Sequence, residues 1–141
     1  MRILARTTLA LFFLPLLCVP ALAGGGSKDL EATPQGKAYR ALLKTVEAGD
    51  YEGYKKAMVA EAARSIDEQT KEMGMTPKKA IEFLKALAPT DIKLTDLKVD
   101  GKKATLSATG KSAGETNWGT IELAEEDGVW KVGQQSWTNK K

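Results

Sequence analysis

Apolar residues recur every three or four positions between residues 34 and 88, and this spacing predicts amphipathic helices. Thr33-Pro34 and Thr76-Pro77 mark two helix starts, because threonine can cap a helix and proline fits its first turn. Gly49 is typical of a helix end, since glycine adopts a left-handed backbone without steric cost. Asp50 can cap the helix that follows. The three predicted helices cover about residues 34–48, 51–72 and 77–88.

After Pro89 the pattern changes to an alternation of apolar and polar residues, which predicts β-strands. The alternation slips once, between Leu94 and Leu97, as a β-bulge would cause. Asp100-Gly101 and Asp127-Gly128 are typical of tight turns between antiparallel strands. The four predicted strands cover about residues 92–99, 104–109, 115–124 and 129–138. Three helices followed by an antiparallel meander predict an α+β fold with the helices packed on one face of the sheet.

The first 23 residues have the order of features found in a secretory signal peptide. Arg2 and Arg6 form a positive start, residues 9–17 form an apolar run, and residues 21–23 (Ala-Leu-Ala) form a cleavage site. The apolar run is too short for a stable membrane span, which needs about 20 residues. Cys18 leaves lipid attachment as an alternative, although leucines rather than small residues precede it. We expect cleavage near Ala23 and a periplasmic or secreted product.

The chain has 141 residues, enough for one domain after a signal peptide. The polar, glycine-rich residues 24–33 predict a flexible lead-in, and residues 34–139 predict a single α+β domain. The net charge of +3 includes the two arginines of the signal segment, so composition gives no argument for nucleic-acid binding. The remainder is therefore nearly neutral.

The composition excludes several kinds of catalytic and metal site. Histidine is absent, which excludes Ser-His-Asp and Cys-His nucleophile pairs and histidine general bases. A single cysteine excludes a disulfide within the chain and a thiolate zinc cluster. We expect no cofactor and no metal ion.

Three segments resemble one known superfamily. Residues 42–51 (LLKTVEAGDY) are similar to a helix, Gly-Asp-Tyr, helix opening, and residues 126–132 (EDGVWKV) to a final hairpin; residues 100–106 (DGKKATL) are similar to a middle hairpin. In this order they resemble small exported bacterial proteins and lipoproteins of the nuclear transport factor two-like superfamily, which have a cystatin-like α+β cone. The resemblance spans about residues 34–138. It implies a curved sheet wrapped around the helices, with a pocket at one end.

That superfamily includes isomerases, dehydratases and hydrolases as well as non-catalytic binding and dimerising modules, so the fold alone does not assign a function. Catalytic members usually place an aspartate, histidine or tyrosine within the cone. The candidates here are Tyr39, Tyr51 and Tyr54, whose hydroxyls could hold a substrate oxygen or could simply lie at the rim of the core. Asp91 and Asp96 could act as bases if buried, or could face water at a turn and at the bulge.

The sheet supplies further candidates. Trp118 has the opposite parity to Ile121 and Leu123 of its strand, unless Gly119 makes a bulge, and it is the candidate for a pocket or interface residue. Gln134 shares parity with Trp130 and is expected to face inward, where it could contact a ligand or a neighbouring side chain. Trp130 is expected in the core, packed against the helix around residues 81–84. The predicted ligand pocket consists of Tyr54, Met58, Trp118 and Gln134.

These observations predict an exported, non-catalytic binding or interaction module. The alternative is a small-molecule enzyme, isomerase-like or dehydratase-like, that uses a tyrosine and an aspartate of the cone. A third reading is an accessory subunit or homodimer that associates through the outer face of the sheet. The expected partner is a small amphipathic molecule or another protein, and not a nucleic acid.

Overall fold

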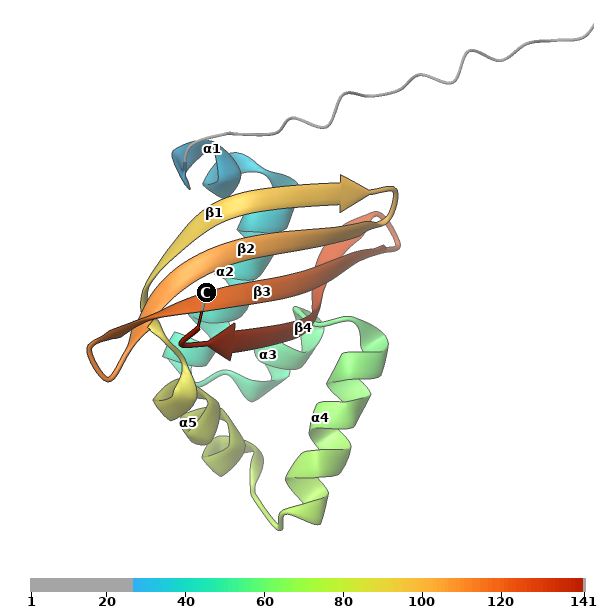
Figure 1. Cartoon of the computed structure of the whole chain (residues 1–141). Coiled ribbons are helices and arrows are strands. Elements are labelled where there is room, and N and C mark those ends of the chain that lie inside the picture. Colours follow the sequence, from blue (N-terminus) through green and yellow to red (C-terminus); the bar gives the residue numbers. More distant parts are fainter. Residues whose placement is uncertain (1–26, 141) are drawn as a thin grey trace, which may run out of the picture.

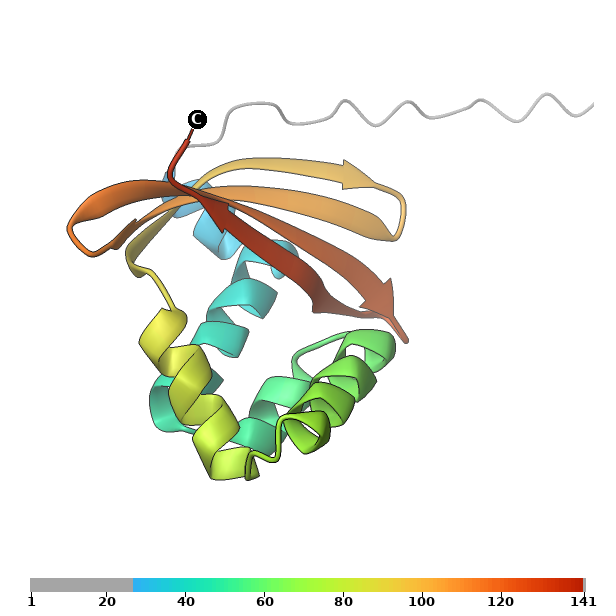
Figure 2. The ribbon, with the colours of Figure 1, turned by 60° about the horizontal axis from the view of Figure 1, so that its bottom comes forward.

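The computed structural model describes residues 27–140, in which five helices precede four strands (Figure 1). The strands form one antiparallel sheet in the order β1-β2-β3-β4, so the predicted α+β class is confirmed. The helices lie together on one side of the twisted sheet (Figure 2). The elements are α1 (Ser27–Ala32), α2 (Pro34–Ala48), α3 (Tyr51–Lys56), α4 (Ala60–Glu72), α5 (Pro77–Leu87), β1 (Thr90–Asp100), β2 (Lys103–Ser112), β3 (Glu115–Glu126) and β4 (Val129–Thr138).

The core fills the space between the inner sheet face and the helices. Its least exposed side chains come from α2, α5 and all four strands, which explains why the apolar spacing predicted these elements correctly. These side chains are Tyr39, Leu42, Ile81, Leu94, Leu106, Ile121 and Val132. No helix within residues 27–140 is long and apolar enough to cross a membrane.

The expectation of one helix over residues 51–72 is wrong, because the chain breaks between α3 and α4. Residues 57–59 leave the helical path and pair with the outer edge of β4. The Val59 N–H donates to the Val132 carbonyl at 2.8 Å, and the Val132 N–H donates to the Ala57 carbonyl at 3.0 Å. We call this segment the edge bridge. The apolar spacing continues through it, since Met58 is buried like Tyr54 before it, and so hides the break from a helical pattern.

The start of α4 is capped by a residue far away in the sequence. Val59, at the capping position, offers no side-chain hydrogen bond. The Glu126 carboxylate, at the end of β3, instead accepts from the Ala60 N–H at 2.9 and 3.2 Å. A negative charge at this end also favours the helix dipole. This contact fixes α4 beside the end of the sheet.

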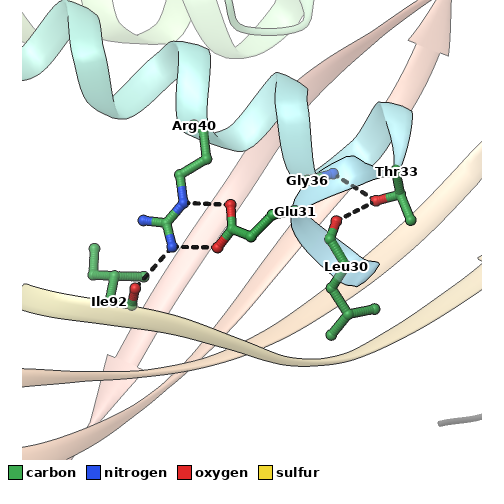
Figure 3. A network of polar contacts seen from close by, with 6 residues as sticks. All are labelled: Leu30, Glu31, Thr33, Gly36, Arg40 and Ile92. Carbon is green, nitrogen blue, oxygen red and sulfur yellow. Dashed lines mark hydrogen bonds and ion pairs between the residues drawn. The ribbon is translucent and has the colours of Figure 1, made fainter. Parts of the chain in front are cut away.

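Residues 27–32 form helix α1, where a flexible lead-in was expected. Leu30 is buried, and its carbonyl accepts from the Thr33 hydroxyl at 2.6 Å (Figure 3). Arg40 of α2 pairs with Glu31 of α1, and it also donates to the Ile92 carbonyl of β1 at 2.8 Å. The lead-in expectation failed because one buried leucine and one ion pair dock a segment of low apolar content. Residues 24–26 and the predicted signal segment, residues 1–23, lie outside the described residues.

The sheet contains two irregularities that matter for the site. The predicted slip in β1 is confirmed as a register shift between Leu94 and Asp96. A second shift lies in β4, where Gln134 pairs with Glu122 and Val132 with Leu123, leaving Gly133 as the extra residue. Beyond Gly133 the inward and outward positions of β4 are therefore exchanged.

Trp130 is half-buried on the inner face of β4, but the prediction that it packs against the helix around residues 81–84 is wrong. Its surroundings come from the start of α2 and the end of α3, including Ala38, Ala41 and Ala57. The α5 residues Ile81 and Leu84 are instead part of a helix that packs on α2 and α3. The edge bridge draws the start of β4 toward α3, which places α5 near the other end of the sheet.

Candidate functional site

A groove of about 740 Å³ lies between α4 and the second half of β4. Its apolar walls come from Met58 of the edge bridge, Ile66 of α4 and Leu84 of α5, and Tyr54 of α3 lies at its base. Polar groups come from Gln134 and Gln135 of β4 and from Ser65 and Gln69 of α4. Two exposed carboxylates, Glu61 and Glu122, are the charged residues of the lining. We call this depression the Tyr54 groove.

Three of the four residues predicted for the pocket, Tyr54, Met58 and Gln134, line the Tyr54 groove together. Tyr54 and Met58 are almost fully buried, with 3% and 7% of their surfaces exposed. Both are also core residues, so they form the wall nearest the centre of the molecule. Tyr54 belongs to α3 and Met58 to the edge bridge, whose pairing with Val132 holds Met58 against β4.

Trp118 does not line this groove. It pairs with Thr109 of β2 and Thr138 of β4, and it is half-buried on the sheet face that the helices leave uncovered. The register of β2 and β3 has no shift, so Trp118 keeps the outward parity. Its neighbour Gly119 faces inward, where an added Cβ would lie 2.7 Å from the indole ring of Trp137. The glycine therefore makes room for an inner tryptophan instead of turning Trp118 inward.

The β4 bulge exchanges the roles of two glutamines. Gln134 shares a row with the exposed Glu122 and does not face inward as expected from parity. Gln135 takes the inward position, and its Oε1 accepts from the Tyr39 hydroxyl at 3.3 Å and from the Trp137 Nε1–H at 3.5 Å. Sequence reasoning missed Gln135. Two signals for it were Gly133, since glycine inside a strand often marks a bulge, and the odd spacing between Val132 and Trp137.

The tyrosine hydroxyls near the groove are hydrogen-bond donors and not bases. Burial raises the pKa of Tyr39 far above its ordinary value, and burial also raises the pKa of Tyr54. Both therefore stay protonated at neutral pH. Within residues 27–140, no side chain forms a hydrogen bond with the Tyr54 hydroxyl. This hydroxyl is a polar group at the base of an apolar groove, which suits it to fix one oxygen or nitrogen of a ligand.

One tyrosine does contact an aspartate, but outside the groove. The Tyr51 hydroxyl lies 3.0 Å from Asp67 Oδ1 and 3.0 Å from Thr70 Oγ1, and the Lys55 ammonium lies 3.0 Å from Asp67 Oδ2. The hydrogen bond from Lys55, and then that from Tyr51, lowers the pKa of Asp67. A carboxylate stabilised in this way is a poor proton acceptor. The cluster fastens α3 to α4, and we assign it a structural role.

The other two aspartate candidates also lie outside the Tyr54 groove. Asp91 is exposed at the start of β1, with a left-handed φ of 51°, as its position in a turn suggested. Asp96 lies at the β1 bulge, half-buried, and it does not line the Tyr54 groove. Within residues 27–140, no three histidine, cysteine, aspartate or glutamate side chains come together as metal ligands.

The lowered pKa of Asp67 predicts a pH-dependent contribution to stability. Asp67→Asn should unfold more easily than the unchanged protein at neutral pH, because the ion pair with Lys55 is lost. The difference in unfolding free energy between the two proteins should be complete above the ordinary aspartate pKa of 3.8. It should shrink as the pH falls through the lowered pKa of Asp67 in the folded protein. Urea unfolding between pH 7 and pH 2 measures it. In a Lys55→Met background the pH dependence should largely vanish; a difference that stays constant with pH would contradict the assignment.

Comparisons with known proteins add no identification. No family model matches the chain, and neither the curated proteins nor the solved structures give a significant match. The geometry of the Tyr54 groove is therefore the evidence that bears on function.

Proposed function

We propose that the protein is an exported, non-catalytic binding module whose ligand is a small, neutral, amphipathic molecule held in the Tyr54 groove. The observation that carries this proposal is the Tyr54 hydroxyl at the base of the groove, with apolar walls and amide groups around it. Such a lining recognises an apolar body with one or two polar atoms. The rim carboxylates Glu61 and Glu122 disfavour an anion.

Binding without turnover follows from the groups that line the groove. A proton transfer at neutral pH needs a base whose pKa lies near the working pH, beside the substrate. The raised pKa of Tyr54 makes it a donor only, and the rim carboxylates are exposed on other elements. The enzyme alternative would need a tyrosine and an aspartate in one cavity, and the contact between Tyr51 and Asp67 supports only a structural pair.

The superfamily of the protein and its export are also proposals. Helix α2, the Gly-Asp-Tyr turn, helix α3 and a twisted antiparallel sheet with helices on one side support a cone of the nuclear transport factor two-like kind. The groove then corresponds to the open end of the cone. Residues 1–23 support export to the periplasm or the medium, with cleavage near Ala23.

Nile red, a neutral apolar dye, tests this proposal in competition with a panel of neutral alcohols, amides and ketones. Saturable dye fluorescence should be displaced by some members of the panel. Ala62→Phe, which fills the groove from α4, should abolish dye binding. Tyr54→Phe should weaken the binding of the displacing compounds about 3–10-fold, which corresponds to the loss of one hydrogen bond.

Trp118→Phe is the matched control, because Trp118 lies on the uncovered sheet face and should leave binding unchanged. Dye binding that survives Ala62→Phe would remove the ligand from this groove. Conversion of a bound compound, followed by NMR over hours, would replace a binding module with an enzyme.

A further inference from the structure

A second groove lies on the other side of the edge bridge, at the start of β4. It has a volume of about 460 Å³ and is bounded by the start of α2, the end of α3 and the turn before β4. Trp130, Ala38, Ala41 and Ala57 form much of its apolar surface. Val129, 57% exposed, adds apolar surface at its mouth. We call it the Trp130 groove.

Three lysines line this groove, and they come from three different elements. Lys37 belongs to α2 and Lys56 to α3, on the helix side of the sheet. Lys131 of β4 has the opposite parity to Trp130, so its side chain lies on the uncovered side of this edge strand. Among residues 27–140, ion pairs are formed by Arg40 and Lys55 and by none of these three lysines. The lining of this groove contains no acidic residue. It therefore combines concentrated positive charge with an aromatic and aliphatic floor.

Neighbouring polar groups leave these ammonium groups available. At the end of α3 the carbonyls of Gly53, Tyr54 and Lys55 accept from the N–H groups of residues 57 and 58. The nearby Glu126 carboxylate is bonded to the Ala60 N–H on the other side of the edge bridge. Lysines scattered over a surface are ordinarily explained by solvation, but here Lys37 and Lys56, from two different helices, line one apolar depression.

We infer that the Trp130 groove binds a small amphipathic anion, with its apolar body against Trp130 and its carboxylate or sulfonate between Lys37 and Lys56. An apolar ligand without charge would leave the lysines without a partner, and an inorganic anion would leave the aromatic floor unused. Opposite charge at a partly dry surface is attractive and is weakened by salt. This site goes beyond the proposed function, because it differs from the Tyr54 groove in place and in the charge of its ligand.

The edge bridge makes the two grooves separately testable. Ala57 lines the Trp130 groove and Val59 lines the Tyr54 groove, while their backbone hydrogen bonds to Val132 close the passage along β4. A substitution in one groove should therefore leave binding in the other intact. Failure of one proposal does not remove the other.

Titration of the full-length protein with sodium octanoate, followed by tryptophan fluorescence and calorimetry, tests the inference. Octanoate should bind saturably, and in the Ala62→Phe variant, whose Tyr54 groove is filled, octanol should bind at least 10-fold more weakly than octanoate. Raising the salt concentration from about 0.05 M to 0.5 M should weaken octanoate several-fold, because exposed charges are screened. Trp130→Phe should remove the fluorescence change while calorimetry still detects binding.

Charge variants identify the groove. The double variant Lys37→Gln/Lys56→Gln should weaken octanoate binding about 10-fold or more, with unfolding by urea unchanged. Lys102→Gln, in the β1–β2 turn, is the matched control and should have no effect. Ala62→Phe should also leave octanoate binding unchanged. Equal affinity of Ala62→Phe for octanol and octanoate, or an undiminished affinity in the double variant, would overturn the inference.

Discussion

Replacing Leu106 by alanine should lower the free energy of unfolding by about 3 kcal/mol, the typical cost of truncating a fully buried leucine. Leu106 has 0% exposure in the middle of β2, where it pairs with Leu97 of β1 and Ile121 of β3. Strands on both sides hold the backbone in place, so the space left by the side chain cannot close. A loss of this size is a large fraction of the stability of a small domain.

Urea unfolding of the two proteins measures this loss. Ser107→Ala is the matched control, since its side chain points to the uncovered face one position along the same strand, and it should change stability by less than about 0.5 kcal/mol. If Ser107→Ala cost as much as Leu106→Ala, the assignment of inner and outer faces would be wrong.

Gly36→Ala is the second substitution with a large expected effect, although alanine normally stabilises a helix relative to glycine by about 1 kcal/mol. A Cβ on Gly36 would lie 2.0 Å from the Leu30 carbonyl oxygen and 3.0 Å from its carbon. These are backbone atoms of α1, so they cannot swing aside as a flexible side chain can. We expect α1 to detach, exposing Leu30 and costing about 2 kcal/mol for the lost burial of one leucine.

Hydrogen exchange shows this detachment directly, as a loss of protection confined to α1 and to its neighbours in β1. Lys44→Ala, on the exposed side of α2, provides the control and should keep α1 protected. Unchanged protection of α1 in Gly36→Ala would contradict the close packing of α1 on α2.

The strands were predictable because alternating apolar residues lie on both sides of each turn. The β1 bulge was visible, since Leu94 and Leu97 mark the change of parity. The β4 bulge was missed, because the three residues that follow Gly133 are polar and the change of parity shows only at Trp137, four residues later. This single glycine decides that Gln135, and not Gln134, turns inward.

The site could be predicted only as far as apolar residues recur at a regular spacing. Tyr54 and Met58, four residues apart, were found from this spacing, although the structure places Met58 in the edge bridge and not in a helix. The Trp130 groove could not be found in this way, because Lys37, Lys56 and Trp130 come from elements far apart in the sequence. No sequence pattern distinguishes a lysine that lines a groove, so only the fold shows that these three residues lie together.

The edge bridge has a further consequence, for how copies of the chain meet each other. Exposed strand edges act as templates for strands of other molecules and so promote aggregation. At the β4 edge, both the N–H and the carbonyl of Val132 are already bonded to residues 57–59. At the β1 edge, the Ile92 carbonyl is bonded to Arg40, and two register shifts interrupt the strand. Neither edge offers an incoming strand an uninterrupted ladder, so the segment that separates the two grooves also protects the sheet against growth into fibrils.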